Sequence, residues 1–178
     1  MSSEKAYLVI TAVGPDRAGL VSELSSLIHA ASANLEDSRM AVLGGEFALL
    51  LLVSGADAAL TRVEGRTRES AGSLGLTLLF KRTSGPRTLK NVLPYTIRVS
   101  GFDRPGIVQA VTGVLARRGV NVSALESRVV NAPESGTPLF VLEASLEVPS
   151  EVALSELRRE LGSRCDEENL DLTLEARR

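Results

Sequence analysis

The stretches GPDRAGLV, residues 14–21, and GFDRPGIV, residues 101–108, decide the fold because they are two copies of one motif. The match continues without a gap over residues 8–35 and 95–122. The identical pairs include Ile10 and Ile97, Gly14 and Gly101, Asp16 and Asp103, Arg17 and Arg104, Gly19 and Gly106, Val21 and Val108, and Asn34 and Asn121. This self-similarity predicts that the chain of 178 residues contains one small structural unit twice.

The first copy begins with an apolar run, Tyr7–Val13, which meets a glycine and suits a strand that ends in a turn. Apolar residues then recur at the spacing of a helix: Leu20, Val21, Leu24, Leu27, Ile28 and Ala31. The pair Gly44-Gly45 predicts a tight hairpin between the next two strands. A second helix over 56–73 and a closing strand over 74–81 complete the order βαββαβ.

The second copy predicts the same order. Its first helix has the apolar stripe Ile107, Val108, Val111, Val114 and Leu115, and it ends at Gly119. We expect Ser150 to be the N-cap of its second helix, directly after Pro149. The other expected elements are a first strand over 95–101, a polar loop over 131–138, a second helix over 150–164 and a closing strand over 170–175.

The predicted fold class is therefore α+β, with two ferredoxin-like βαββαβ domains in tandem. The expected boundaries are residues 1–82 for the first domain, 83–94 for the linker and 95–178 for the second domain. The linker assignment follows from Gly85, Pro86 and Pro94.

One strand of the first copy is apolar on both faces. Along 47–53, phenylalanine, leucine and valine point one way, while Ala48, Leu50 and Leu52 point the other. Burying each leucine is worth roughly 1.5–3 kcal/mol, so we expect the other domain or another subunit to cover the second face. In the second copy the matching strand has Glu143, Ser145 and Glu147 on one face and is expected to be more solvated.

The strand-to-helix loop is the candidate binding site of each copy. An aspartate stands where an N-cap belongs, and a glycine leaves the backbone of the first helical turn open to a ligand. Amide groups at a helix start favour a carboxylate, and the amides of the two asparagines are candidate acceptors for an ammonium group. The candidate ligand-binding residues are Asp16, Arg17, Ala18, Gly19, Leu20 and Asn34 in the first copy, and Asp103, Arg104, Pro105, Gly106, Ile107 and Asn121 in the second.

A purely structural interpretation of the same residues stays open. The aspartate then caps a helix, the glycine permits a turn, and the asparagine adopts a strained loop conformation. Duplication preserves structural residues as well as functional ones, so the repeat by itself does not decide between the two interpretations.

Composition argues against nucleic-acid binding, cofactors and catalysis. The net charge is −2, aromatic residues make up 3%, and there is no tryptophan, which disfavours a phosphate-binding face or a base-stacking platform. His29 is the single histidine and Cys165 the single cysteine, so we expect a histidine at the surface or the edge of the core and a small, buried or half-buried apolar cysteine. No phosphate loop, nucleophile elbow or metal spacing is present, and we expect neither a cofactor nor a metal.

The first residues, MSSEKAYLVI, lack the pattern of a signal peptide, and the longest apolar run is too short to span a bilayer as a helix. The expected location is therefore the cytoplasm, with no membrane association.

On the strength of these motifs the chain resembles ACT-domain proteins, whose βαββαβ units bind small ligands near the first strand-to-helix loop. The stretches YLVITAVGPDRAGLV, NLEDSRMAVLGGEFALLLLVSG and LLFKRT are similar to the glycine cleavage system transcriptional repressor family over essentially the full length. The chain departs from the usual ACT loop at Ala18, where proline is common, and Ser32 stands where the second copy has a glycine.

The resemblance implies an amino-acid-responsive, non-catalytic regulator that does not contact DNA itself. Such a repressor binds a separate DNA-binding transcription factor, and glycine relieves the inhibition. The alternatives are a sensory subunit that binds an amino acid and controls a metabolic enzyme, and a purely structural dimerisation module. The identity of the amino acid, the number of active sites and the presence of a homodimer stay open.

Overall fold

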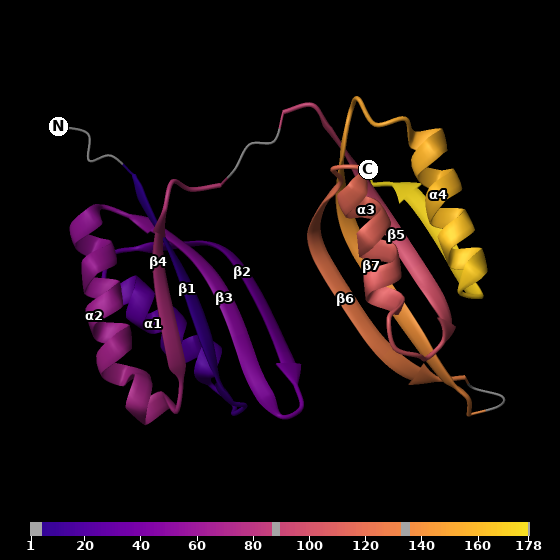
Figure 1. Cartoon of the computed structure of the whole chain (residues 1–178). Helices are drawn as coiled ribbons and strands as arrows, with labels where there is room; N and C mark the ends of the chain where they lie inside the picture. The colour runs from indigo at the N-terminus through magenta and orange to yellow at the C-terminus, as the bar shows by residue number, and fades with distance from the viewer. Residues whose placement is uncertain (1–4, 87–89, 133–135, 178) are drawn as a thin grey trace. The chain divides into compact units, whose positions relative to one another are not determined.

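The computed structural model describes residues 5–86, 90–132 and 136–177, and the chain divides into two compact units. Within these ranges each unit has one four-stranded antiparallel sheet and two helices (Figure 1). The predicted ferredoxin-like βαββαβ pattern is confirmed in both units. No helix of the described ranges is long and apolar enough to cross a membrane.

The first unit has its sheet in the order β2-β3-β1-β4. Its elements are β1 (Ala6–Pro15), α1 (Leu20–Ala30), β2 (Asn34–Leu43), β3 (Glu46–Gly55), α2 (Asp57–Leu74) and β4 (Thr77–Thr83). The strand with the candidate loop at its end is therefore central, while β2 is an edge strand.

The second unit has the equivalent order β6-β7-β5-β8. Its elements are β5 (Val92–Phe102), α3 (Ile107–Arg117), β6 (Asn121–Asn131), β7 (Pro138–Pro149), α4 (Leu154–Glu167) and β8 (Leu170–Ala176). Because β4 runs to Thr83 and β5 begins at Val92, the connection between the strands is shorter than the expected linker over 83–94.

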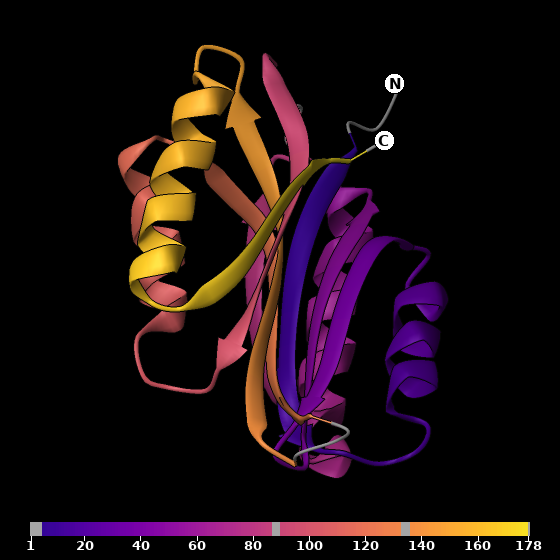
Figure 2. The same cartoon turned by 90° about the vertical axis from the view of Figure 1, so that its right-hand side faces the viewer.

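Both helices of a unit lie on the same face of its sheet (Figures 1 and 2). The alternation along the strands explains this layering, because every second residue of the central strands is buried under the helices. The largest buried side chains include Leu8, Ile10, Leu24, Phe47 and Leu60 in the first core and Ile97, Leu115, Leu142, Leu157 and Leu161 in the second. The described helices of a unit leave the opposite face of its sheet uncovered.

Left-handed backbone conformations occur where the repeat pattern predicts turns. Gly44 and Gly45 have φ of 62° and 85°, which confirms the tight hairpin between β2 and β3. Gly119 has φ of 67° directly after α3, as expected of a helix end. Its counterpart Ser32 adopts the same conformation with φ of 61°, so the first unit places a non-glycine residue in a position that favours glycine.

The prediction that Ser150 caps a helix is wrong. The helix α4 begins at Leu154 with Ala153 as its N-cap. The Ser150 backbone N–H instead donates to the carbonyl of Asn91, and Val152 N–H donates to Pro149 O in a turn. The first of these bonds extends the pairing of β7 with β5, so α4 begins only after the turn, at Leu154. The expected polar loop 131–138 lies partly outside the described residues.

Two glycines let the central strand of each sheet pass close to the end of the second helix. A Cβ on Gly14 would lie 2.3 Å from the carbonyl oxygen of Gly75, the residue that ends α2. A Cβ on Gly101 would lie 2.6 Å from Leu170 Cδ2 and 3.1 Å from Asn169 O. The shared glycine of the motif therefore serves packing between strand and helix end.

We expect Gly14→Ala to lower the free energy of unfolding of the first unit by about 1–3 kcal/mol, because backbone must move to admit the methyl group. The matched control is Gly72→Ala inside α2, where nothing lies within 4 Å of the added Cβ. That variant should gain about 0.5–1 kcal/mol from helix propensity. Urea denaturation of both variants checks the pair, and equal stabilities would contradict the packing argument.

Candidate functional site

The candidate loop of the first unit connects the end of β1 to the start of α1. The N-cap of α1 is Gly19, with φ of 95°, and no side chain forms a capping hydrogen bond. The expectation that Asp16 caps this helix is therefore wrong. Its backbone N–H donates to Gly45 O at 3.2 Å, which ties the loop to the β2–β3 hairpin and places the aspartate three residues before the N-cap.

The second unit repeats this geometry. Gly106 is the N-cap of α3 with φ of 99°, again without a capping side chain, and Asp103 N–H donates to Pro138 O at 3.4 Å. Asp103 is therefore not an N-cap either. Pro105 is exposed at the position that Ala18 occupies in the first loop.

The uncapped helix starts leave backbone donors available. The first N–H groups of any helix have no intrahelical acceptor, and no side chain of these loops satisfies them here. Leu20 is 1% exposed and Ile107 is 3% exposed, so their side chains belong to the cores. Only their backbone amides can face a ligand.

A hollow of about 470 Å³ adjoins the first loop. Its lining includes Asp16, Arg17, Gly19, Val21, Met40 and Phe47. Met40 comes from the edge strand β2 and is 56% exposed. This methionine is not identifiable from the sequence, because its position beside the loop follows from strand register: Met40 pairs with Leu49 of β3.

Both loop arginines are held by carboxylates of their own unit. Arg17 donates to the two carboxylate oxygens of Glu23 at 2.7 and 3.0 Å. This pairing raises the pKa of Arg17 and lowers the pKa of the Glu23 carboxyl. Arg104 instead bonds the carbonyl oxygen and the carboxylate of Glu168, at the end of α4. Glu23 was not identified from the sequence, because the repeat places Ala110 at its position in the second copy.

The candidate asparagines lie at the other end of each sheet from the loops. Asn34 pairs with Ser54, whereas the loop begins after Pro15, which pairs with Glu46. Eight residues of β3 separate those positions, a distance of roughly 25 Å. Asn121 likewise pairs with Glu147, far from the end of β5. The structure therefore does not bring loop and asparagine of one unit together.

Each asparagine amide already has a carboxylate partner. Asn34 Nδ2 donates to Glu36 Oε1 at 3.0 Å, and Asn121 Nδ2 donates to Glu147 Oε2 at 2.6 Å. Glu36 also forms an ion pair with Lys5 at 2.8 Å and accepts a hydrogen bond from Ser54. The lysine, the serine hydroxyl and the asparagine amide together lower the pKa of Glu36 to about 2.

The described residues hold no group of three or more His, Cys, Asp or Glu side chains arranged to bind a metal. His29 is exposed, as expected. Cys165 is 1% exposed, which agrees with the expected buried or half-buried cysteine, and burial raises the pKa of its thiol.

The depressed pKa of Glu36 makes a pH-dependent prediction. Its interactions stabilise the folded state above the ordinary pKa of 4.5, and this contribution is lost as the pH falls through about 2. We expect Glu36→Gln to be less stable than the parent chain at neutral pH and the difference to close between pH 4.5 and 2. Urea denaturation across that range checks it, with the exposed Glu46→Gln as control. A pH-independent difference would contradict the assignment.

Comparison with known proteins relates this chain to one family. Residues 6–81 match a model of the ACT domain, and residues 95–162 match a second model of that domain. The chain is 28% identical to the glycine cleavage system transcriptional repressor of Escherichia coli over 167 residues, which cover 94% of this chain and 88% of the repressor. Formyltetrahydrofolate deformylase of Mycobacterium tuberculosis is 44% identical over 62 residues, which are 34% of this chain and 19% of the enzyme.

Two crystal structures are similar over nearly the whole chain. A protein from Galdieria sulphuraria has 32% identity and a TM-score of 0.82, with 98% of this chain and 100% of that chain covered. A structure assigned to a glycine cleavage system transcriptional repressor has 30% identity and a TM-score of 0.71, with 97% of each chain covered. The repeated motif, the two βαββαβ units and these matches agree, and the chain belongs to the ACT-domain family as a tandem pair of ACT domains.

Proposed function

We propose that this chain is a non-catalytic, amino-acid-responsive regulator that controls a DNA-binding transcription factor of glycine cleavage genes by protein–protein contact. The observation that carries the proposal is the near full-length similarity to the Escherichia coli repressor, which covers both ACT domains. A net charge of −2 supports action through a protein partner rather than through DNA phosphates.

The ligand site is assigned to the strand-to-helix loop. The carboxylate of a small amino acid would accept hydrogen bonds from the uncapped N–H groups at the start of α1, where the helix dipole also favours negative charge. Asp16 is among the residues that line the hollow beside this helix start, and a carboxylate suits the ligand's ammonium group. Asn34 of the same unit lies too far away to share that ligand.

Regulation follows from differential binding. An effector shifts a regulator between two states only by as much as its affinities for the two states differ, typically about 1–3 kcal/mol. Glycine or another small amino acid that binds the partner-free state better would release the transcription factor. Because no bond is made or broken in this cycle, the buried Cys165 and the exposed His29 need no chemical role.

A second candidate function is a sensory subunit that binds an amino acid and controls a metabolic enzyme. The similarity to part of formyltetrahydrofolate deformylase favours it, because that match joins an ACT-like segment to an enzyme. The similarity covers only 34% of this chain, whereas the repressor similarity covers 94%, so the transcriptional role is preferred.

Amino-acid binding predicts a thermal shift. At a ligand concentration about one hundredfold above the dissociation constant, the stability should rise by about 2.7 kcal/mol. Thermal melting of the full chain against a panel of amino acids measures it, and we expect glycine or another small amino acid to raise the melting temperature. A flat response across the panel would argue for a purely structural module.

Matched substitutions identify the unit that binds. Met40→Trp places a bulky indole beside the loop hollow of the first unit, and Ser127→Trp places the same group at the equivalent exposed position of β6, which pairs with Leu142. If the first loop binds the ligand, Met40→Trp abolishes the thermal shift while Ser127→Trp keeps it. If the thermal shift persists in both variants, the assignment of the ligand site to the loops is wrong.

The identity of the protein that binds this chain distinguishes between the two candidate functions. Affinity purification of the tagged chain from its own cells, with and without the amino acid that shifts its melting, should recover a transcription factor that the amino acid releases. Recovery of a metabolic enzyme under the same ligand control would instead establish the second candidate.

A further inference from the structure

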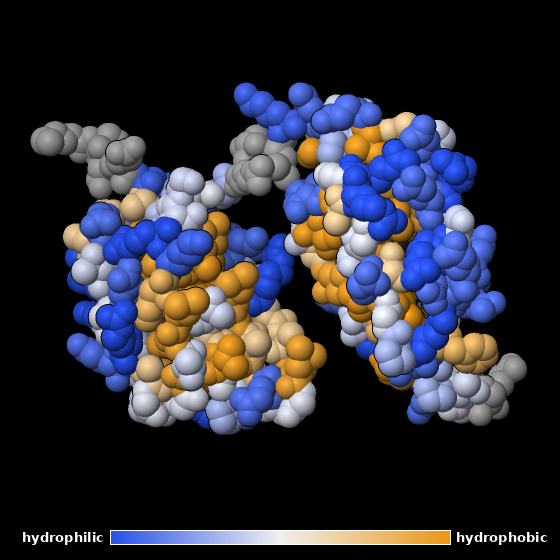
Figure 3. All heavy atoms as spheres, in the orientation of Figure 1, coloured by the Kyte–Doolittle hydropathy of each residue, from blue (hydrophilic) through white to orange (hydrophobic). Residues whose placement is uncertain are grey.

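The first unit presents apolar side chains at two places outside its core. On the face that its helices leave open, Figure 3 shows a hydrophobic area over the strands, and Leu50 of β3 and Leu79 of β4 are exposed there. On the side that carries the helices, Val21 and Met40 line the hollow beside the first loop and are exposed as well. Both places are candidates for contact with another molecule, because clustered exposed apolar side chains commonly mark binding sites.

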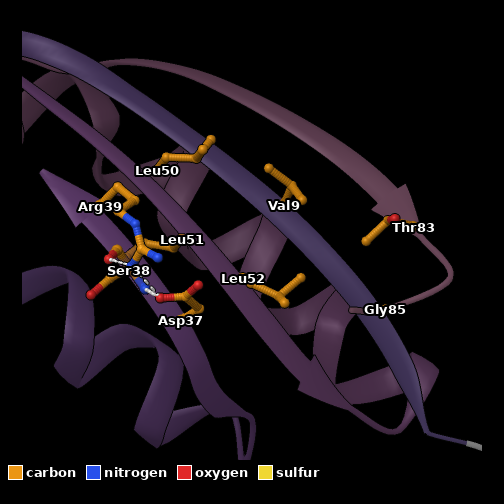
Figure 4. A pocket seen from close by; sticks show the side chains of 9 residues that line it. All are labelled: Val9, Asp37, Ser38, Arg39, Leu50, Leu51, Leu52, Thr83 and Gly85. Atoms are coloured by element: carbon orange, nitrogen blue, oxygen red, sulfur yellow. Dashed lines mark hydrogen bonds and ion pairs between the residues drawn. The ribbon is translucent and has the colours of Figure 1, made fainter. Parts of the chain in front are cut away.

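The open face carries a hollow of about 240 Å³, which Figure 4 shows from close by. Val9, Leu50 and Leu52 belong to its apolar lining, and Asp37 and Arg39 of β2 are its charged side chains. These two charges pair with each other, with Arg39 Nη1 2.6 Å from Asp37 Oδ1. An amino acid placed here would have to break that ion pair or leave its own charged groups against valine and leucine. This hollow therefore matches a zwitterion poorly.

The hollow of about 470 Å³ beside the first loop combines groups that suit both charges of an amino acid with apolar side chains. Asp16 lines it, and so does Gly19, the N-cap of a helix start that no side chain caps. Arg17 also lines it but is held by both carboxylate oxygens of Glu23. The carboxylate of an amino acid therefore suits the helix start, and its ammonium group suits Asp16.

The apolar lining of this hollow comes from three elements. Phe47 of β3 is buried, whereas Val21 of α1 is 43% exposed. Met40 of β2 pairs with Leu49, which is buried under the helices, so the two side chains lie on the same side of the sheet. The methionine therefore lies on the side of α1 and not on the open face. Val21 and Met40 leave apolar surface in water unless a ligand covers it.

We propose that this hollow accepts the side chain of the bound amino acid, and that Met40 selects a short aliphatic side chain over the hydrogen atom of glycine. The inference rests on the proposed function, whose ligand site it makes more specific. With the carboxylate at the helix start and the ammonium group at Asp16, the third group on the α-carbon is left to meet the remaining lining. That lining includes Val21, Met40 and Phe47.

The methionine is a feature of the first unit and not of the repeat. The equivalent residue of the second unit is Ser127, which pairs with Leu142 as Met40 pairs with Leu49. A serine is too short and too polar to make the same apolar contact. The methionine side chain is unbranched and flexible, so it can follow aliphatic chains of different length. We therefore expect selection by chain length at the first loop.

A series of straight-chain amino acids tests the proposal. Glycine, alanine, 2-aminobutyrate and norvaline each differ from the next by one methylene, and each is titrated into the full-length chain by isothermal titration calorimetry. Every added methylene should lower the dissociation constant about two- to fourfold, because the hollow is open to solvent and removes part of each methylene from water.

Three variants test whether Met40 is responsible, through the glycine dissociation constant divided by that of norvaline. Met40→Ser gives the first unit the residue of the second and should lower this ratio at least about threefold. Met40→Leu keeps an aliphatic side chain of similar size and should keep the ratio within about twofold. The matched control is Leu43→Ser, which removes a 73% exposed leucine from the opposite face of the same strand and should leave the ratio unchanged.

Equal affinities for the four amino acids, or weaker binding of the longer ones, would overturn the proposal but not the proposed function, since an amino acid would still bind. If none of the four binds, the proposal fails, and the thermal melting panel decides whether the proposed function fails with it. A Met40→Ser variant with the ratio of the parent chain would also overturn the assignment, as would an equal loss in Leu43→Ser.

Discussion

The two described helices of each unit must cover the same face of a four-stranded sheet. This constraint determines most of the architecture of both units. The covered face forms the core, with every second side chain of the central strands buried below the helices. The other face has no cover from the helices of its own unit, and its chemistry is free to differ between the two copies.

The same layering fixes the position of the loops. In each unit a helix on the covered face follows the central strand directly. The N-cap of that helix is a glycine in a left-handed conformation, Gly19 in the first unit and Gly106 in the second. Closer to the strand, Gly14 or Gly101 lets the chain pass the end of the second helix. Two glycines of the motif therefore have a structural role in each copy. The backbone N–H groups at the helix start have no side-chain cap and stay available to an anion.

The two copies have diverged at positions that the fold leaves unconstrained. Arg17 is held by Glu23 on its own helix, while Arg104 reaches the end of α4. Met40 adjoins the loop of the first unit, where the second has an exposed serine. At the centre of the open sheet face, Leu50 of the first copy is exposed, whereas the second copy has Glu143 in an ion pair with Arg98. The scaffold is therefore the same in both copies, while the side chains on these surfaces differ.

The sequence by itself determined the repeat, the βαββαβ order, the tight hairpin at Gly44-Gly45 and the apolar second face of β3, because local spacing and backbone preferences carry that information. It did not determine that Asp16 and Asp103 stand before rather than at the N-caps, or that Ser150 extends a strand, because backbone pairing with distant residues decided both. Only the tertiary structure separated Asn34 from the loop and brought Met40 beside it, because strand register joins residues that no sequence interval relates.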